Sequence, residues 1–245
     1  FMKSSTRTRV SFETGIFQMG GTGLFLSSRD IQLGRGEPIS DTARVLSRYI
    51  DGIMARLFDH QDAVDLAQHS TIPVINGLTD LLHPCQALAD LQSVTEHFGK
   101  TQGLTMAYIG DGNNMAHSLI NLAGVLGMQL TVCTPPSYAP NAAVVESGRA
   151  LASTSGGEIQ LETDPQRAVR DAEFVYTDVW ASMGQESQAE ERRGIFEPYQ
   201  VNAALLANAP PGVKLLHCLP AHRGEEVSAE VFEAQASIIF DQAEN

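Results

Sequence analysis

Short runs of β-branched and aliphatic residues alternate along the chain with segments in which apolar residues recur every three or four positions. This alternation is typical of an α/β protein with parallel sheets. In the first part of the chain the pattern predicts strands at 24–26, 52–55 and 72–75. It predicts helices at 41–49, 61–68 and 84–98. Pro84 suits the first turn of the last helix, where a missing N–H group costs nothing.

The pattern restarts near Gly99–Gly103, which divides the chain into two predicted domains, 1–99 and 100–245. In the second domain the expected strands are 106–109, 129–133, 158–161, 174–176, 214–216 and, as the last one, 238–240. The expected helices are 115–126, 141–151 and one that opens at Asp164-Pro165. Each domain is predicted to have three layers, a mainly parallel sheet flanked by helices. Ligands of such sheets bind at the carboxyl ends of the strands.

Charge narrows the expected partners. The 245 residues include 16 Lys and Arg against 29 Asp and Glu, a net charge of −13. So acidic a chain is a poor ligand for nucleic acid or an anionic membrane, and it has no apolar run of ~20 residues that could span a bilayer. Its three cysteines are widely spaced, which argues against a disulfide framework or a zinc ribbon and favours a reducing compartment such as the cytoplasm.

The segment Ser4–Arg9 precedes apolar residues at helical spacing, so a helix is expected to begin there. A helix N-terminus presents free N–H groups and the positive end of the helix dipole. Interleaved hydroxyl and guanidinium groups would strengthen binding of a phosphate. The alternative is a capped helix with solvated arginines. Two arginines and two threonines in an acidic protein favour the phosphate site.

His83 and Gln86 lie three residues apart at the start of the long helix and share one face of its first turn. They could donate hydrogen bonds to a carbonyl or amide oxygen. A helix cap with a hydrogen-bonded histidine is the simpler interpretation of this pair alone. Metal binding is less favoured, because no second ligand follows at a regular spacing.

The turn Gly110–Asn114 lies between a predicted strand and a predicted helix and begins as Gly-x-Gly. Met115 occupies the position of the third glycine of a dinucleotide-binding motif, and no acidic residue follows the next strand. We therefore reject NAD binding. Asparagine side chains presented to a small ligand remain an open interpretation.

Asp178 and Cys218 each follow a predicted strand. A carboxylate on a strand-end loop could hold an ammonium group, or it could be a solvated acid. Cys218 could be a reactive thiol or a buried packing residue, and no neighbouring Lys or Arg obviously lowers its pKa. His217 should point to the other side of the extended chain.

Together these motifs are specific. The order Ser-Thr-Arg-Thr-Arg, His-Pro-x-Gln, Asp-x-x-x-Ser-Met-Gly, His-Cys-Leu-Pro resembles the aspartate/ornithine carbamoyltransferase superfamily and, within it, the ornithine carbamoyltransferase family. The stretches Asp41–Leu46 and Asp241–Asn245 are also similar to that family. The resemblance covers essentially the whole chain. It implies a carbamoyl-phosphate domain, an ornithine domain and a homotrimer with active sites at subunit interfaces.

The resemblance also implies roles for individual residues. Carbamoyl phosphate would be bound by Ser5, Thr6, Arg7, Thr8, Gln32, Arg56, His83, Gln86, Cys218 and Leu219. Within that set Gln32 would reach into a neighbouring subunit. Ornithine would be bound by Asn114, Asp178, Ser182 and Met183. The implied catalytic residues are Arg56, His83 and Cys218, with a proton-accepting role for Cys218.

By this resemblance the uncharged δ-amine of L-ornithine attacks carbamoyl phosphate, citrulline and phosphate form, and no metal or organic cofactor is required. No cation lies in 181–185, which disfavours aspartate as the acceptor. The alternatives left open are another amine, such as putrescine or an acylated ornithine, and a non-catalytic carbamoyl-phosphate-binding relative. The family usually extends beyond Phe1 and adds a helix after Asn245. We therefore expect neither a normal trimer nor full activity from these 245 residues alone.

Overall fold

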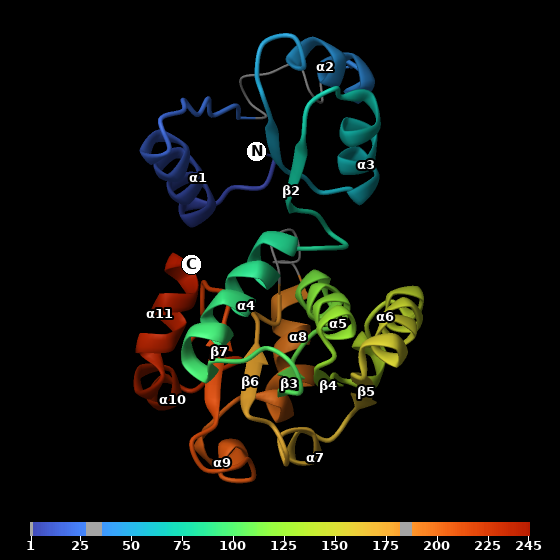
Figure 1. The fold of residues 1–245 in the computed structure, drawn as a ribbon. Coiled ribbons are helices and arrows are strands. Elements are labelled where there is room, and N and C mark those ends of the chain that lie inside the picture. The colour runs from blue at the N-terminus through green and yellow to red at the C-terminus, as the bar shows by residue number, and fades with distance from the viewer. Residues whose placement is uncertain (1, 28–35, 182–187) are drawn as a thin grey trace. The chain divides into compact units, whose positions relative to one another are not determined.

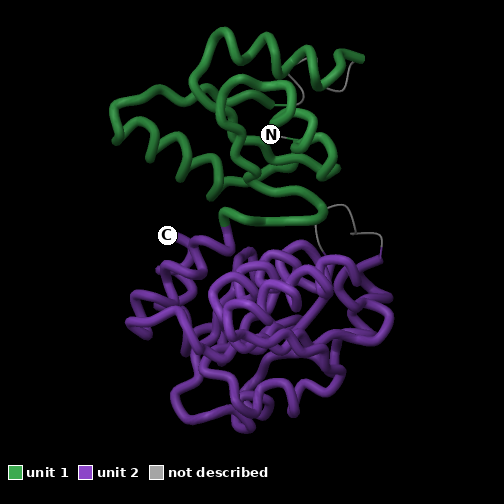
Figure 2. Tube along the Cα trace, turned by 45° about the vertical axis from the view of Figure 1, so that its right-hand side comes forward, with its two compact units in different colours: residues 1–85 green, residues 86–245 purple. Residues whose placement is uncertain are grey.

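The computed structural model describes residues 2–27, 36–181 and 188–245. The chain forms two compact units, residues 1–85 and 86–245 (Figure 2). The boundary between them falls at the start of helix α4 (Pro84–Phe98), whereas the restart of the sequence pattern at Gly99 follows the end of that helix. Each unit has its own buried apolar cluster. In both units parallel strands are flanked by helices, which confirms the predicted fold class.

Unit 1 is built on two parallel strands, β1 (Ile53–Arg56) and β2 (Val74–Leu78). Its helices are α1 (Thr6–Gln18), α2 (Ile39–Leu46) and α3 (His60–His69). The core comprises Ala43, Ala55, Leu57, Ala63 and Leu66. The predicted strand at 24–26 is wrong, because residues 21–27 have no regular secondary structure. Leu24 is 74% exposed, so it does not lie on the buried face of a sheet within this unit.

Unit 2 contains a five-stranded parallel sheet in the order β5-β4-β3-β6-β7 (Figure 1). Its strands are β3 (Thr105–Ile109), β4 (Gln129–Cys133), β5 (Glu158–Glu162), β6 (Phe174–Thr177) and β7 (Lys214–His217). The chain builds outward from β3 to β5 and then returns to the other side of β3 for β6 and β7. The connectivity therefore reverses between β3 and β6, the position at which open parallel sheets form ligand crevices.

Helices cover both faces of this sheet. Helices α5 (Asn114–Leu126) and α6 (Ala142–Ser155) pack side by side on one face (Figure 1). Because the connection from β6 to β7 runs in the opposite direction across the sheet, right-handed crossovers place the next helices on the other face. The remaining helices are α7 (Pro165–Ala168), α8 (Ala189–Phe196), α9 (Ala203–Leu206), α10 (Ala229–Ala234) and α11 (Ala236–Glu244), with short 3₁₀ turns at Pro136–Tyr138 and Glu197–Tyr199.

The predicted strand at 238–240 is wrong, because these residues belong to helix α11. Ile238, Ile239 and Gln242 are buried, whereas Phe240 is 53% exposed. Buried positions at this spacing lie on one face of a helix, not on alternate sides of a strand. Three consecutive apolar residues do not distinguish the helical period of about 3.6 residues from the strand period of two.

Among the described residues no helix is both long enough and apolar enough to cross a bilayer.

A buried ion pair anchors helix α8 to the sheet. Arg192 is 3% exposed and bonds to the Asp111 carboxylate and to the backbone carbonyl of Trp180. Its guanidinium also lies over the rings of Tyr138 and Phe196. Burial raises the pKa of Asp111 to about 6, with Arg192 acting in the opposite direction. Arg192 thus holds together the loop after β3, the loop after β6 and α8.

Candidate active site

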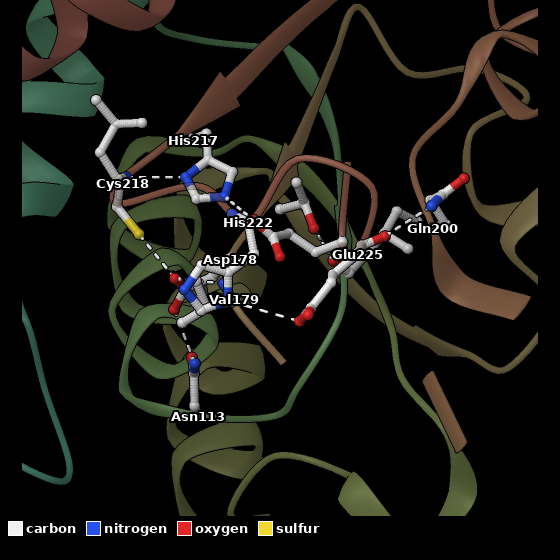
Figure 3. Close-up of polar contacts among 12 residues, drawn as sticks. Asn113, Asp178, Val179, Gln200, His217, Cys218, His222 and Glu225 are labelled. Carbon is white, nitrogen blue, oxygen red and sulfur yellow. Dashed lines mark hydrogen bonds and ion pairs between the residues drawn. The ribbon is translucent and has the colours of Figure 1, made fainter. Parts of the chain in front are cut away.

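Polar side chains from three neighbouring strands meet at the carboxyl edge of the unit 2 sheet (Figure 3). Asn113 follows β3, Asp178 directly follows β6, and Cys218 directly follows β7. Because β3, β6 and β7 are adjacent and parallel, residues that follow them by a few positions lie close together. This cluster lies where the connectivity of the sheet reverses.

Asp178 is the centre of the cluster and is 7% exposed. Its Oδ2 accepts a hydrogen bond from Asn113 Nδ2 at 2.9 Å. Its Oδ1 accepts from the Val179 amide at 2.8 Å and from Cys218 Sγ at 3.0 Å. Three donors from three strand ends therefore fix the carboxylate.

Asn113 is oriented by its second role as the N-cap of α5. Its Oδ1 accepts from the Met115 and Ala116 amides at 2.9 and 3.3 Å, so its Nδ2 is the group that faces Asp178. The resemblance singled out the neighbouring Asn114, which is the first residue of the helix. The N-cap position before the apolar helix was the signal that could have identified Asn113 as well.

Cys218 is half-buried and carries its proton at neutral pH. Burial, together with Asp178, raises the pKa of its thiol well above the ordinary range. A protonated thiol donates to Asp178, as the 3.0 Å contact requires. The arrangement favours a hydrogen-bonding thiol over a free thiolate nucleophile.

The turn after Cys218 is tied to a buried histidine. His217 is fully buried, and its Nε2 lies 3.0 Å from Glu226 Oε1, while its Nδ1 accepts from the Leu219 amide at 2.8 Å. The side chains of His217 and Cys218 have different partners, Glu226 and Asp178. Leu219 has a φ of 55°.

Behind this edge a second network surrounds the buried Asp90 of α4. Asp90 Oδ1 accepts from Gln86 Nε2 at 2.9 Å, from Gln242 Nε2 at 2.6 Å and from the Tyr176 hydroxyl at 3.4 Å. Gln242 Oε1 also accepts from the His217 amide at 2.9 Å. The network connects Gln86, predicted as a ligand residue, with α11 and β7. Sequence reasoning missed Asp90, Tyr176 and Gln242.

Asp90 gives unit 2 a stability that falls as pH rises. Burial raises its pKa from 3.8 to about 7, so the folded protein retains a proton that the unfolded chain loses between these values. Between pH 5 and 7 the free energy of unfolding of wild type should therefore fall relative to that of Asp90→Asn, which cannot ionise. The expected difference is on the order of 1 kcal/mol per pH unit.

Urea unfolding of both proteins at pH 5, 6 and 7 measures this difference, with Asp51→Asn as a control at an exposed position. If the difference in free energy of unfolding between wild type and Asp90→Asn did not change with pH, Asp90 would ionise in the folded protein as readily as in the unfolded chain.

Unit 1 presents a different chemistry at the start of α1. Ser5 is the N-cap, and its Oγ accepts from the Thr8 amide at 3.2 Å and donates to Thr8 Oγ1 at 3.0 Å. Arg56, at the end of β1, donates from one terminal nitrogen to Thr8 Oγ1 at 3.3 Å. Thr6 and Arg7 are exposed in the first turn. The predicted helix start, its hydroxyls and Arg56 thus lie together.

This part of unit 1 concentrates positive charge. Arg56 is 6% exposed, and burial together with Arg7 lowers the pKa of its guanidinium. Burial also lowers the pKa of Lys3, with Arg56 acting in the same direction and Asp80 in the opposite one. Among the described residues, no hydrogen-bond partner meets the buried Nε of Arg56. Mutually repelling cations and an unsatisfied buried donor are features of an anion site.

His83 lies directly before α4 and belongs to the same electrostatic environment. Burial, and then Arg56 and Lys3, lower its pKa to about 3. The imidazole is therefore neutral at physiological pH. A neutral histidine can donate a single N–H to a ligand without adding charge.

Three predicted residues, Gln32, Ser182 and Met183, lie outside the described residues.

The two glycines of the turn after β3 are required by the local backbone. Gly110 has a φ of +148°, and a Cβ on Gly112 would lie 2.3 Å from the Pro140 nitrogen. The backbone that approaches Gly112 is the protein's own.

One group within the described ranges has the spacing of metal ligands, namely His222, Glu225 and Glu226. Its two carboxylates already have partners, because Glu225 pairs with Arg193 and Glu226 with His217. We assign no metal to it.

The sequence matches two models that together cover almost the whole chain. Residues 1–96 match the carbamoyl-P binding domain of aspartate/ornithine carbamoyltransferase. Residues 102–245 match the Asp/Orn binding domain of the same family. The two matches follow each other along the chain without overlap.

Individual relatives agree with these matches. The chain is 58% identical over its 245 residues to an ornithine carbamoyltransferase from Thermococcus kodakarensis, of which it covers 78%. The solved ornithine carbamoyltransferase from Pyrococcus furiosus is 54% identical, with a TM-score of 0.95 over 99% of this chain and 77% of that one. An anabolic ornithine carbamoyltransferase from Campylobacter jejuni is 42% identical, with a TM-score of 0.94 over 98% of this chain and 80% of that one.

Proposed function

The chain belongs to the aspartate/ornithine carbamoyltransferase family, and from this premise we propose how its residues divide the reaction. The activity is that of an ornithine carbamoyltransferase. It transfers the carbamoyl group of carbamoyl phosphate to the δ-amine of L-ornithine, which gives citrulline and phosphate. The observation that carries this conclusion is identity of 54–58% to relatives of that activity over the full chain.

Residues of unit 1 would hold the phosphate and carbamoyl groups. The proposed set is Ser5, Thr6, Arg7, Thr8, Arg56 and His83, with Gln32 from a neighbouring subunit. The cluster of cations and the unsatisfied Nε of Arg56 support an anionic ligand here. Neutral His83 would donate to the carbamoyl oxygen, where negative charge develops when the amine attacks.

Residues of unit 2 would hold the amine substrate and handle its proton. The proposed ornithine set is Asn114, Asp178, Ser182 and Met183, while Gln86, Cys218 and Leu219 would contact the carbamoyl group. Asp178 would pair with the α-ammonium and leave the δ-amine free to attack. A new C–N bond then forms, the C–O bond to phosphate breaks, and the amine loses a proton. The proton-accepting role proposed for Cys218 would fall to the Cys218–Asp178 pair.

A homotrimer and a cytoplasmic location are the remaining parts of the proposal. The bacterial and archaeal sources of these relatives support the location. The proposal is a homotrimer, or a higher assembly, of the full-length protein. Light scattering of the full-length protein tests it, with a mass below that of three chains as the contrary result.

Citrulline formation tests the acceptor. Carbamoyl phosphate is supplied in parallel assays with ornithine, aspartate, acetylornithine or putrescine, and strong turnover is expected with ornithine alone. Turnover only with another amine would overturn the assignment of ornithine as the acceptor, but it would not affect the proposed carbamoyl-phosphate residues. A folded protein that binds carbamoyl phosphate but turns over no amine would be a non-catalytic relative.

A substitution at Arg56 tests the proposed binding of carbamoyl phosphate by unit 1. Arg56→Met should lower kcat/KM for carbamoyl phosphate about 10²-fold, because it removes a preorganised buried donor and a positive charge. The exposed Arg44 pairs with Asp41 in the same unit, so Arg44→Met is the matched control and should leave kcat/KM unchanged. Steady-state kinetics at saturating ornithine measure both variants. Equal kcat/KM values for Arg56→Met and Arg44→Met would mean that carbamoyl phosphate does not bind at Arg56.

A further inference from the structure

The contact between His217 and Glu226 is the most deeply buried polar pair of the described structure that the assigned chemistry leaves unused. Both side chains are fully buried, and Nε2 and Oε1 are 3.0 Å apart. Glu226 belongs to the segment between β7 and α10, nine residues after His217. Burying a carboxylate is costly unless donors satisfy it, so its retention here needs a reason.

The hydrogen bonds define the tautomer of His217. The Leu219 amide donates to Nδ1, so Nδ1 carries no proton. The proton is therefore on Nε2 and is donated to Glu226. Glu226 Oε1 also accepts from the His222 amide at 2.6 Å, which fixes the carboxylate. Glu226 thus selects the one neutral tautomer that can accept the Leu219 N–H group.

This acceptor controls an unfavourable backbone. Leu219 has a φ of 55°, a region that residues other than glycine seldom occupy. Its hydrogen bond to His217 stabilises that conformation. The His217 amide is in turn held by Gln242, so the residue before Cys218 is fixed through both side chain and backbone. The position of Cys218 against Asp178 depends on this turn.

We propose that Glu226 and His217 are positioning residues for the carbamoyl transfer, because they hold the Cys218–Leu219 turn in the geometry that presents the thiol to Asp178. The proposal rests on the function assigned above. Neither residue contacts the proposed substrates. The pair acts through a backbone amide, in the way that a carboxylate orients a histidine in other active sites.

Two substitutions at His217 separate the two hydrogen bonds. In Asn the Oδ1 atom takes the place of Nδ1 and can still accept from Leu219, but it does not reach Glu226. In Gln the Nε2 atom takes the place of the ring Nε2 and can still donate to Glu226, but it leaves the Leu219 amide without an acceptor. Both variants are made in the intact protein.

We expect His217→Gln to lower kcat about tenfold or more while KM for both substrates changes less than about threefold. His217→Asn should retain more of kcat than His217→Gln. A second readout needs no turnover: alkylation of Cys218 by iodoacetamide, followed by peptide mass spectrometry, should be several-fold faster in His217→Gln than in His217→Asn. Cys133, which is fully buried, serves as the internal reference.

Equal kcat and equal Cys218 alkylation in the two variants would overturn the proposal. If neither variant folds, Glu226→Gln is the next test, since it keeps the shape and removes the charge. It should lower kcat about threefold and accelerate Cys218 alkylation, and wild-type values for both would overturn the proposal. Absence of citrulline formation by the wild type would refute the assigned function, while the alkylation comparison would still test the positioning role.

Discussion

Asp178→Asn should lower kcat/KM for ornithine by about 10²- to 10³-fold. The substitution removes the charge proposed to pair with the α-ammonium group. The Asp178 carboxylate accepts hydrogen bonds from Asn113, Val179 and Cys218. The substitution also replaces one of its acceptor oxygens with an NH₂ group, which would face these donors. Loss of one partner from a buried charge pair costs about 3–5 kcal/mol, and each 1.4 kcal/mol is about tenfold.

Initial rates over a range of ornithine at saturating carbamoyl phosphate measure this effect. Asp178→Ala should be at least as impaired. The control is Asp171→Asn at an exposed position just before β6, which should retain wild-type kinetics. If ornithine turnover survived at Asp178→Ala unharmed, the acceptor site would have to be sought elsewhere.

Arg192→Met should lower the free energy of unfolding by about 3–5 kcal/mol. Arg192 is buried against Asp111, and its loss leaves a buried carboxylate without its counter-charge and the Trp180 carbonyl without its donor. The pKa of Asp111, already raised to about 6 by burial, should rise further. Urea unfolding at pH 8 measures the difference, since Asp111 is ionised there in the wild type.

The neighbouring Arg193 is the matched control. Its side chain is 60% exposed and pairs with Glu225, so Arg193→Met should cost less than about 1 kcal/mol. Similar losses at both positions would show that the helix α8 surface, not the buried ion pair, determines stability. The double variant Arg192→Met/Asp111→Asn should be more stable than the sum of the single changes predicts.

The central strands of unit 2 could be predicted because burial on both faces produces continuous apolar runs. Residues 129–133 are a strand with the predicted ends, and Phe174, Val175 and Tyr176 are all fully buried. Short runs outside this sheet are ambiguous. Residues 24–26 are not a strand, and 238–240 belong to a helix, because three apolar residues define neither a face nor a period.

The candidate site was predictable only where a motif marks a residue. Asp178 and Cys218 were predicted from their positions after strands and from the family resemblance, and the structure brings them within hydrogen-bond distance of each other. Glu226, Asp90 and Gln242 were not found. Their contacts join residues on separate elements, such as Asp90 and Gln242, 152 positions apart, and no local periodicity encodes such pairs. Helices α8 to α10 were not predicted, because such short segments contain too few turns to show a helical period.

The strand order also determines when this site can exist during synthesis. Strands β3, β4 and β5 are neighbours in both sequence and space, so they can associate as soon as they emerge from the ribosome. Strand β6 must return to β3 from far along the chain, as the Thr177 hydroxyl does to the Ile109 carbonyl 68 residues away. Asp178 and Cys218 follow β6 and β7. A nascent chain that has formed the first half of this sheet therefore carries Asn113 but neither Asp178 nor Cys218, and the proposed amine-binding edge is assembled last.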